Sequence, residues 1–281
     1  MDLWFSDFHQ DNVKLSINVE REVYSEHSEY QHIAVLDSKE YGRILALDGE
    51  LITTEKDESF YSEMVVHVPM NTKSDIKTVL VIGGLDGGVL TELEKYETIE
   101  TIDVVELDQR AVEVCQEYLP QSKVAFQDER VNLYIQDALK FVRRKENAYD
   151  LIIVDSANPF GLNESLFTRE FYGNCYNALT ENGILISQQA NSFYQEDVTA
   201  FRHIRDRLQA VFPRNTVYLT SVPSYAAGYL LVGFSSKGID PKESTQLASR
   251  SAISTQYYND DIHVGAFYLP NYIKEMLTSE T

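Results

Sequence analysis

Three acidic residues of the chain stand where each could bind a positively charged ligand or a nucleoside. They are Asp86, Glu106 and Asp137, and each stands at the end of an apolar segment or in the glycine-rich turn after one. A carboxylate attracts ammonium and sulfonium ions, and it accepts hydrogen bonds from ribose hydroxyls or an adenine amine. Each acid alone could be only a helix N-cap, and for Asp137 that explanation is as good as the functional one. Because the three acids stand at three successive strand ends, independent capping of three helices is the poorer explanation.

The segment around Asp86 reads Gly83-Gly84-Leu85-Asp86-Gly87-Gly88 and joins an apolar run to a helical pattern. Its glycines, beginning with Gly83, let the backbone approach a ligand closely at the start of a helix. The dinucleotide fingerprint GxGxxG does not fit, and a carboxylate at Asp86 would repel a pyrophosphate. The segment therefore favours a cationic S-adenosyl compound over NAD. A tight turn without a ligand is the alternative.

Asp155 follows the apolar run 151–154 and is the carboxylate best placed to act as a base. An alkylamine is mostly protonated at neutral pH, so an N-alkyltransferase needs a group that accepts this proton and orients the amine. Aligning the amine, the reacting carbon and the leaving sulfur should provide most of the acceleration. The alternative for Asp155 is an Asp that caps the turn before Pro159.

Strands and helices that alternate along the second part of the chain are predicted to bring these acids together. The predicted strands are Thr78–Ile82, Thr101–Val105, Val131–Ile135, Leu151–Val154, Ile184–Ser187, Thr216–Leu219 and Tyr229–Phe234. The predicted helices lie near Val89–Tyr96, Arg110–Tyr118, Ala138–Arg144, Thr168–Leu179 and Asp197–Val211. This alternation indicates an α/β fold with a parallel sheet covered on both faces, and a ligand then lies at the carboxyl ends of the strands.

The first 72 residues have a different pattern and are predicted to form a small antiparallel β domain with a following helix. The predicted strands are Val13–Tyr24, Tyr30–Leu36 and Ile44–Leu47, separated by turns at 40–42 and 47–49. Apolar residues at helical spacing predict a helix over Glu55–Val68, which Pro69 should end. We place the boundary near Asn71–Asp75, so the domains are 1–72 and 73–281.

The composition restricts the partners of the protein. Its 281 residues include 44 acidic and 24 basic ones, which gives a net charge of −20. This charge repels phosphate backbones, so we expect no nucleic-acid partner, and it attracts cations, which suits a polycationic small molecule. Solubility alone also explains an acidic composition. The charge supports a cationic substrate only together with the acids described above.

Neither a membrane segment nor a metal site is expected. No apolar run approaches the length of a bilayer span, and the N-terminus lacks a secretory signal, which predicts a cytoplasmic protein. The two cysteines, Cys115 and Cys175, lie inside helical patterns and form no CxxC pair or Cys/His cluster. We interpret both as core thiols.

The chain resembles the spermidine synthase (polyamine aminopropyltransferase) family over nearly its whole length. The matching segments are Leu3-Trp4-Phe5, Ser28-Glu29-Tyr30-Gln31, Leu47-Asp48-Gly49, Thr54-Glu55-Lys56-Asp57-Glu58, Tyr61-Ser62-Glu63-Met64, the glycine-rich segment, Val154-Asp155-Ser156, Glu164-Ser165-Leu166-Phe167-Thr168 and Val222-Pro223-Ser224-Tyr225. The resemblance implies a Rossmann-like domain of the S-adenosylmethionine-dependent methyltransferase type after an N-terminal β domain. It also implies decarboxylated S-adenosylmethionine as co-substrate, 5'-methylthioadenosine as by-product, no tightly bound cofactor, no metal, and a homodimer or homotetramer.

The resemblance also assigns roles to individual positions. Those that match the family's donor-binding residues are Gln31, Asp86, Glu106 and Asp137. Those that match the residues for the acceptor diamine and the transferring group are Tyr61, Asp155 and Tyr225. Gln31, Tyr61 and Tyr225 rest on the resemblance alone.

Four positions depart from the family pattern. Leu85 replaces the usual third glycine and should narrow the space beside the donor, and Ser62 stands where His, Gln or Asn is common. Asn158 replaces the second carboxylate of Asp-Ser-Ser-Asp-Pro, to which the amine's proton is usually assigned, and Asn191 replaces another frequent acid. An amide accepts a hydrogen bond but takes up no proton. The loss of these two acids weakens the case for putrescine as acceptor.

Three alternatives to aminopropyl transfer to a diamine therefore stay open. The same fold could use another amine acceptor, or S-adenosylmethionine itself as donor. The protein could instead be a non-catalytic nucleoside-binding homologue, which the loss of an acid at Asn158 would permit. A small-molecule methyltransferase fits the fold alone, but the N-terminal motifs argue against it.

Overall fold

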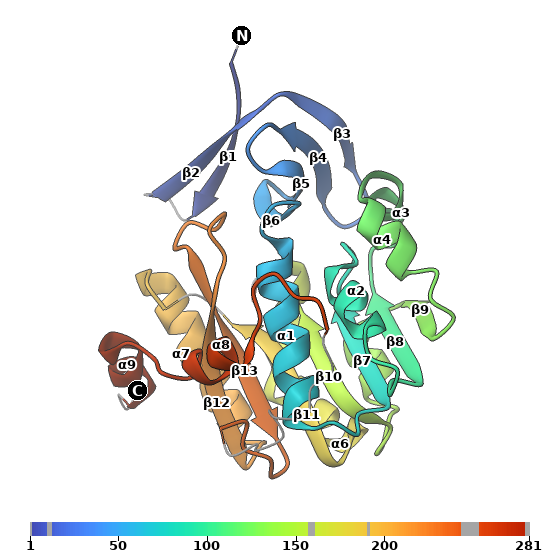
Figure 1. Cartoon of the computed structure of the whole chain (residues 1–281), viewed down its shortest axis with the longest axis vertical. Helices are drawn as coiled ribbons and strands as arrows, with labels where there is room; N and C mark the ends of the chain where they lie inside the picture. Colours follow the sequence, from blue (N-terminus) through green and yellow to red (C-terminus); the bar gives the residue numbers. More distant parts are fainter. Residues whose placement is uncertain (1, 10–12, 157–160, 190–191, 243–252, 279–281) are drawn as a thin grey trace.

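The chain folds into a small β unit that lies on a larger α/β unit (Figure 1). The computed structural model describes residues 2–9, 13–156, 161–189, 192–242 and 253–278. The strands of the β unit are β1 (Leu3–His9), β2 (Val13–Val19), β3 (Arg21–His27), β4 (His32–Ser38), β5 (Gly42–Leu47) and β6 (Glu50–Thr54). Strands β1 and β2 form an antiparallel pair, and β3 to β6 form a four-stranded antiparallel sheet.

The predicted antiparallel β unit is confirmed, but two details of the prediction are wrong. The predicted strand Val13–Tyr24 is two strands, because the chain leaves one sheet at Glu20 and enters the other. Strands β1 and β6 were not predicted. The turn between β5 and β6 consists of Asp48 and Gly49, whose φ angles of 52° and 83° suit a two-residue hairpin.

The α/β unit is built on a seven-stranded sheet in the described chain. Its strands are β7 (Thr78–Gly83), β8 (Thr101–Glu106), β9 (Val131–Ile135), β10 (Tyr149–Asp155), β11 (Leu179–Gln189), β12 (Arg214–Ser221) and β13 (Tyr229–Ser236). Their spatial order is β12-β13-β11-β10-β7-β8-β9, and each overlaps a predicted strand. The sheet is not parallel throughout, since β13 runs antiparallel to both neighbours. The connection 222–228 is too short for the crossover that a parallel neighbour needs.

Helices cover both faces of this sheet. They are α1 (Glu58–Thr72), α2 (Gly88–Glu94), α3 (Gln109–Tyr118), α4 (Pro120–Ala125), α5 (Ala138–Val142), the 3₁₀ helix η1 (Gly161–Phe167), α6 (Arg169–Ala178), α7 (Gln195–Gln209), α8 (Asp260–Gly265) and α9 (Asn271–Thr278). Successive side chains of a strand face opposite sides. Val79 and Val81 of β7 accordingly pack in the core that contains α1 and α2, whereas Leu80 and Ile82 pack in the core that contains α5 to α7.

Helix α1 is buried on nearly all sides and is longer than predicted at one end and shorter at the other. It begins at Glu58 rather than Glu55, and it continues past Pro69 to Thr72. The prediction that Pro69 ends the helix is wrong. A proline in the last turn removes one backbone donor only, and the carbonyl of Pro69 still accepts a 2.9 Å hydrogen bond from the N–H of Lys73.

The β unit is joined to the α/β unit through helix α3. Ile33 and Leu45 of the β unit share one apolar cluster with Ala111 and Cys115 of α3. Cys115 and Cys175 are both buried free thiols, as predicted. Residue Leu85 also belongs to this cluster, so its side chain helps to hold α3 and the β unit together while it lines the cavity described below.

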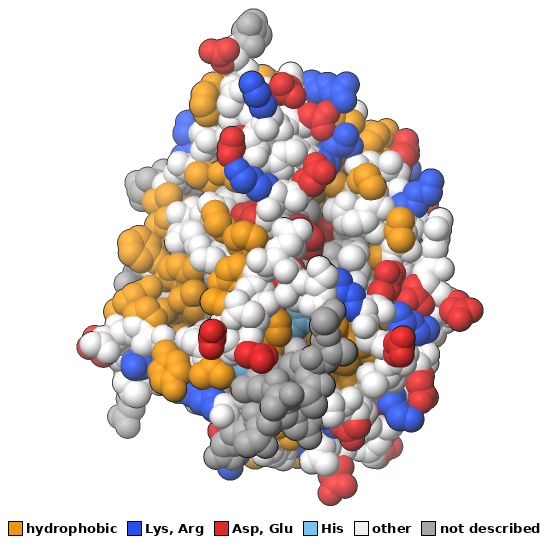
Figure 2. All heavy atoms as spheres, in the orientation of Figure 1, with side chains coloured by type: hydrophobic (Ala, Val, Ile, Leu, Met, Phe, Trp, Pro, Cys, Tyr) orange, Lys and Arg blue, Asp and Glu red, His pale blue; other side chains and the backbone are white. Residues whose placement is uncertain are grey.

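The surface has mixed character. Figure 2 shows acidic and basic side chains interspersed over one face, with hydrophobic side chains gathered toward its left, where α7 and α9 lie. In the described chain no helix is both long and apolar enough to cross a membrane.

Candidate active site

A cavity of about 400 Å³ opens at the carboxyl edge of the large sheet and is closed on its other side by the β unit. The predicted site residues that line it are Gln31, Tyr61, Gly83, Asp86, Glu106, Asp137, Asp155 and Tyr225. The structure therefore brings these predicted residues into one place. Asn158 and Asn191 lie outside the described residues. The volume is that of a small-molecule site.

The glycine-rich turn after β7 forms one wall of the cavity, and its backbone requires glycine. Gly83 has a φ of 90°, and a Cβ at this position would lie 2.2 Å from the backbone oxygen of Asp155. Gly87 has a φ of 83°, and its Cβ would lie 2.4 Å from Cα of Ser122. The absence of a side chain at Gly83 lets the turn pass directly beside the end of β10, so Asp86 and Asp155 reach the same space, and its absence at Gly87 lets the turn pass beside α4.

Asp155 stands at the end of β10 and is held by Tyr61 of α1. The Tyr61 hydroxyl donates a hydrogen bond of 2.7 Å to Oδ1 of Asp155. Burial raises the pKa of the Asp155 carboxyl to about 7, with the Asp86 and Glu106 carboxylates adding to the rise and the Tyr61 hydrogen bond opposing it. Burial and the neighbouring Asp155 also raise the pKa of the Tyr61 hydroxyl. Asp155 can therefore change its protonation state near neutral pH.

Glu106 and Asp137 follow the next two strands and use part of their hydrogen-bonding capacity on the backbone. Oε1 of Glu106 accepts bonds of 2.7 Å and 3.1 Å from the N–H groups of Leu107 and Asp108, and neither bond uses Oε2. Asp137 caps α5, since its Oδ1 accepts a 2.9 Å bond from the N–H of Lys140. The capping explanation for Asp137 is thus correct, and the residue lines the cavity as well.

Gln31 reaches the cavity from the start of β4 and is fixed by Asp108. Its Nε2 donates a 3.0 Å hydrogen bond to Oδ2 of Asp108, which also accepts one of 2.6 Å from the Ser28 hydroxyl. Oδ1 of Asp108 caps α3 through the N–H of Ala111 at 3.2 Å. One buried carboxylate therefore ties the β unit to the α/β unit directly beside Glu106.

Tyr225, in the turn between β12 and β13, closes the other end of the cavity. Its hydroxyl donates a 2.7 Å hydrogen bond to the backbone oxygen of Ile52. The turn is also fixed by the buried Asp57, whose Oδ2 accepts a 2.8 Å bond from the N–H of Ser224 and whose Oδ1 accepts one of 2.5 Å from Thr54. Burial raises the pKa of the Tyr225 hydroxyl, with Asp155 and Asp86 contributing.

The cavity favours positive charge. Burial raises the pKa of Asp86 and of Glu106, although backbone hydrogen bonds oppose the rise at both carboxyls. The described residues that line the cavity include no Lys, Arg or His, so no cationic side chain of this lining compensates the carboxylates when they ionise. A bound ammonium or sulfonium ion would supply that compensation. Within the described ranges, no group of three or more His, Cys, Asp or Glu residues is arranged to hold a metal ion.

Reasoning from strand ends missed several residues of the cavity wall. Gln188 near the end of β11 lies at a carboxyl edge, so the same strand-end rule could have identified it. Glu58 and Thr53 are different, because they belong to α1 and β6, and no periodic pattern indicates that these elements face the sheet edge. Glu58 lies one turn before Tyr61 on α1, but this spacing identifies Glu58 only once Tyr61 is known to face the cavity.

Comparison with known proteins finds related sequences that match the whole length of the chain. The spermine/spermidine synthase domain matches residues 58–245, and the spermidine synthase tetramerisation domain matches residues 3–55. The polyamine aminopropyltransferase of Clostridium botulinum (strain Alaska E43 / Type E3) is 49% identical over 282 residues, which cover 100% of this chain and 99% of that protein. The one of Clostridium beijerinckii is 48% identical and covers both chains fully.

Solved structures with the same fold are also similar in sequence. A spermidine synthase in complex with the transition state analogue AdoDATO superposes with a TM-score of 0.94 at 37% identity, covering 98% of this chain and 94% of that one. The spermidine synthase from Thermotoga maritima gives a TM-score of 0.93 at 37% identity, with the same coverage. With both parts of the chain matched and the predicted fold present, this chain belongs to the spermine/spermidine synthase family.

Proposed function

We propose that this protein is a polyamine aminopropyltransferase, which transfers the aminopropyl group of decarboxylated S-adenosylmethionine to a diamine such as putrescine. The observation that carries the proposal is the convergence of Asp86, Glu106 and Asp155 on one cavity, where burial raises the pKa of each carboxyl. Donor and acceptor together bring a sulfonium and several ammonium groups. Such ligands suit this cavity better than any anion.

The donor-binding part of the cavity is assigned to the ends of β7, β8 and β9. Oε2 of Glu106 is available for the ribose hydroxyls, and Asp137 stands at the next strand end, where the adenine amine is expected. Gln31 and Gly83 complete this part of the site, the latter through close backbone approach. The sulfonium then lies toward Asp155, in the order in which the strands are arranged in the sheet.

Asp155 is assigned to the acceptor amine together with Tyr61 and Tyr225. The amine nitrogen forms a bond to the aminopropyl carbon while the bond between that carbon and sulfur breaks, and the sulfur leaves as the neutral thioether of 5'-methylthioadenosine. The proton of the amine passes to Asp155, whose pKa of about 7 suits an acceptor at neutral pH. The Tyr61 hydrogen bond fixes the carboxylate so that its second oxygen can face the amine.

The direct test uses the purified full-length protein with decarboxylated S-adenosylmethionine and a panel of amines: putrescine, cadaverine, agmatine and spermidine. Formation of 5'-methylthioadenosine, followed by chromatography, with at least one amine is the expected result. S-Adenosylmethionine in place of the decarboxylated donor is the matched comparison. No product from any pair would contradict the proposal.

Asn158 leaves one alternative function open, since an amide at this position takes up no proton. A non-catalytic nucleoside-binding protein would bind 5'-methylthioadenosine but turn over no amine. Activity that arises only in the Asn158→Asp variant would favour that alternative. Activity of the unchanged protein would instead show that Asp155 suffices as proton acceptor.

The assembly and location proposed for the protein follow from the same family. We propose a homodimer or homotetramer, supported by the tetramerisation domain matched at residues 3–55 and by the exposed Trp4 and Phe8 on β1. The cytoplasmic location and the division of the chain near residues 71–75 stay predictions.

A further inference from the structure

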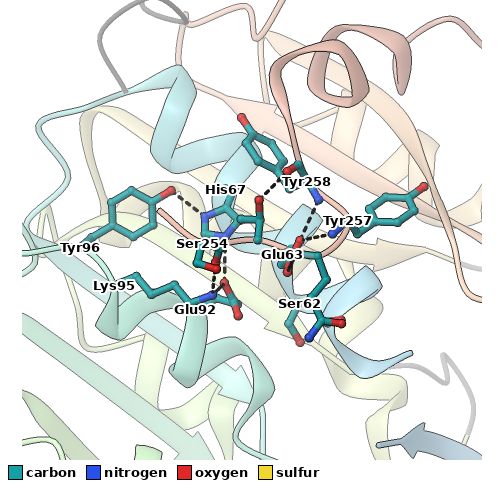
Figure 3. Close-up of polar contacts among 12 residues, drawn as sticks. Ser62, Glu63, His67, Glu92, Lys95, Tyr96, Ser254, Tyr257 and Tyr258 are labelled. Atoms are coloured by element: carbon teal, nitrogen blue, oxygen red, sulfur yellow. Dashed lines mark hydrogen bonds and ion pairs between the residues drawn. The ribbon is translucent and has the colours of Figure 1, made fainter. Parts of the chain in front are cut away.

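Glu63 is a buried acid of α1 that does not line the cavity and has no part in the proposed function. It lies two residues beyond Tyr61, and only 1% of it is exposed. Both oxygens of its carboxylate accept hydrogen bonds from the backbone of residues 256–258, as Figure 3 shows. These bonds come from the N–H groups of Gln256, Tyr257 and Tyr258 and measure 2.7, 2.8 and 2.7 Å.

The three bonds matter because residues 253–259 form neither a helix nor a strand. A buried backbone N–H without a partner is unfavourable, and an irregular segment does not supply regular partners of its own. Glu63 supplies partners for three successive residues at once. The carboxylate therefore attaches segment 256–258 to one side of α1.

Tyr257 extends this attachment to the turn between β12 and β13. Its ring stacks on the ring of Phe60 in α1, with 4.8 Å between the two centroids. Its hydroxyl accepts a 3.2 Å hydrogen bond from the N–H of Ser221, the last residue of β12. Tyr257 thus contacts both the helix that carries Tyr61 and the strand that leads to Tyr225.

Other contacts keep α1 in place independently of Glu63. The Tyr218 hydroxyl on β12 donates a 3.0 Å hydrogen bond to a backbone oxygen of α1. On the side that faces α2, Nε2 of His67 lies 2.8 Å from Oε2 of Glu92 (Figure 3). Loss of the Glu63 bonds should therefore loosen the part of α1 that carries Tyr61 without releasing the whole helix.

We infer that Glu63 is a positioning residue for the transfer reaction: through segment 256–258 it holds Tyr61 and Tyr225 in fixed places relative to Asp155. The inference rests on the proposed function, which assigns these three residues to the acceptor amine. An amine must be aligned with the reacting carbon, and small displacements of the groups that orient it lower the rate. Glu63 acts from outside the cavity, because its bonds go to the backbone of segment 256–258.

The protonation of Asp155 reveals how firmly Tyr61 is held. Burial raises the pKa of Asp155, and the Tyr61 hydrogen bond opposes this rise. If Tyr61 is held less firmly, part of the opposing effect is lost and the pKa of Asp155 rises further. The carboxylate then becomes a base only at higher pH.

Several titratable groups face Asp155 from the surrounding elements. They are Tyr61 and Glu58 of α1, Asp86 of the turn after β7, Glu106 of β8, and Tyr225 of the turn after β12. Burial and the Asp86 carboxylate raise the pKa of Glu58 to about 8, so Glu58 also titrates near neutral pH. A substitution at Glu63 removes none of these groups, so a change at Asp155 then reflects its geometry.

The Glu63→Gln variant tests the inference through the pH dependence of kcat/KM for the amine. An amide keeps the size of the side chain but offers one acceptor oxygen in place of two. We expect the midpoint of the pH profile to rise by about half a pH unit, and kcat/KM at neutral pH to fall about 3- to 10-fold. The Kd for 5'-methylthioadenosine, measured by calorimetry, should stay within about twofold of the wild type, because the donor part of the site lies at the ends of β7, β8 and β9.

The double variant Glu63→Gln, Tyr61→Phe shows whether Glu63 acts through Tyr61. Tyr61→Phe alone should raise the midpoint, because the hydrogen bond to Asp155 is lost. The double variant should have the same midpoint as Tyr61→Phe, since the hydroxyl that Glu63 positions is absent from both. A further rise in the double variant would show that Glu63 acts by another route and would overturn the inference.

Asp103→Asn is the matched control for the loss of a buried acid. Asp103 lies in β8, is 7% exposed, and accepts hydrogen bonds of 2.6 and 3.2 Å from Tyr149 and Asn132. This control should lower the Tm, as Glu63→Gln does, without moving the midpoint of the pH profile. A midpoint that moves equally in both variants, or in neither, would leave Glu63 a structural role only and contradict the inference.

Tyr257→Phe is the second variant if Glu63→Gln does not fold. It removes the hydrogen bond from Ser221 but keeps the ring and the backbone bond to Glu63. The KM for the amine should rise about 2- to 5-fold through the turn that carries Tyr225. The exposed Tyr268→Phe is its control and should leave the KM unchanged. Equal KM values for the two variants would overturn the inference.

A direct titration of Asp155 separates the inference from the proposed function. NMR of protein labelled with carbon-13 at its aspartate carboxyl groups follows this residue, whose signal is the one missing from Asp155→Asn. A higher midpoint in Glu63→Gln than in the wild type supports the positioning role, even if the wild type forms no product, which would overturn the function alone. Product formation together with equal midpoints would overturn the inference and leave the function intact. No product and equal midpoints would overturn both.

Discussion

The hydroxyl of Tyr61 and Oδ1 of Asp155 are joined by a 2.7 Å hydrogen bond, although 94 residues separate them along the chain. Tyr61 comes from α1 and Asp155 from the end of β10, so the bond connects the helix after the β unit with the centre of the sheet. It leaves Oδ2 of Asp155 as the oxygen that can accept a proton. The bond therefore orients the proposed base rather than consuming it.

Replacing Asp155 by Asn should lower kcat by about 10²- to 10⁴-fold, since the amide keeps the shape but accepts no proton. Tyr61→Phe removes only the orienting bond and should have a smaller effect on kcat. Steady-state formation of 5'-methylthioadenosine measures kcat for both variants. The exposed Tyr268→Phe serves as the matched control for the second variant. Full activity of Asp155→Asn would exclude this residue as the base.

The rate should rise with pH across neutrality, because Asp155 acts as a base only when ionised. Its pKa of about 7 reflects burial and the facing groups Asp86, Glu106 and Tyr61. We expect kcat/KM for the donor to increase between about pH 6 and 8 at saturating acceptor. In the Asp155→Asn variant this increase should become smaller. The pH dependence that remains then reflects deprotonation of the acceptor amine. An identical pH profile for both proteins would contradict the assignment.

The stability of the ligand-free protein should fall over a similar range. The folded-state pKa values of Asp155 and Glu58, about 7 and about 8, exceed their unfolded values near 4. Between these limits the folded protein holds more protons than the unfolded chain, so the free energy of unfolding decreases as the pH rises. Acids with lowered pKa values, such as Asp37 and Asp128, are fully ionised above about pH 5 in both the folded and the unfolded state. Their contribution to stability is therefore constant over this range.

Thermal melts at constant ionic strength from pH 5 to 8 measure this effect. The Tm of the wild type should decline, and the decline should be shallower in the Asp155→Asn and Glu58→Gln variants. A saturating concentration of the donor should also make the decline of the Tm shallower, because a bound cation stabilises the ionised acids. A Tm that rises with pH in all these proteins would show that other groups dominate.

The sequence allowed the acids at strand ends to be predicted because the carboxyl ends of parallel strands meet at one edge. For Asp86, Glu106 and Asp155, the positions of the apolar segments along the chain were enough to make this prediction. Glu58 could not be found in the same way, since its place depends on how α1 packs against α2, a tertiary contact with no periodic signal.

The errors in secondary structure have a similar origin. Pro69 was predicted to end a helix by a local rule, but burial of α1 among β11, β12 and α2 stabilises one more turn. The break at Glu20 was missed because Val19 and Val23 keep the same alternation on both sides of the charged residues 20–22, even though the strands on the two sides belong to different sheets. Local pattern thus identified elements better than it identified their ends.

Gly83→Ala should disturb the site through its backbone. The new Cβ would meet the Asp155 backbone oxygen at 2.2 Å, and a φ of 90° disfavours any side chain. We expect a destabilisation of about 1–3 kcal/mol and weaker donor binding, measured by denaturant unfolding and calorimetry. Gly173→Ala in α6, where no atom lies within 4 Å of the new Cβ, is the control and should be neutral or slightly stabilising. Equal effects of the two substitutions would contradict the strain argument.

The β1–β2 pair should carry part of the subunit interface. A two-stranded pair is marginally stable alone, yet on β1 it exposes 56% of Trp4 and 68% of Phe8. Exposed aromatic side chains on such an element indicate a surface that another chain covers. We expect light scattering coupled to size exclusion to show a dimer or tetramer for the wild type and a smaller species for the Trp4→Ser, Phe8→Ser double variant. Val124→Ser, at a residue that is 63% exposed on α4, should leave the mass unchanged. If the double variant keeps the mass of the wild type, the interface lies elsewhere, and the hydrophobic surface near α7 and α9 in Figure 2 becomes the next region to mutate.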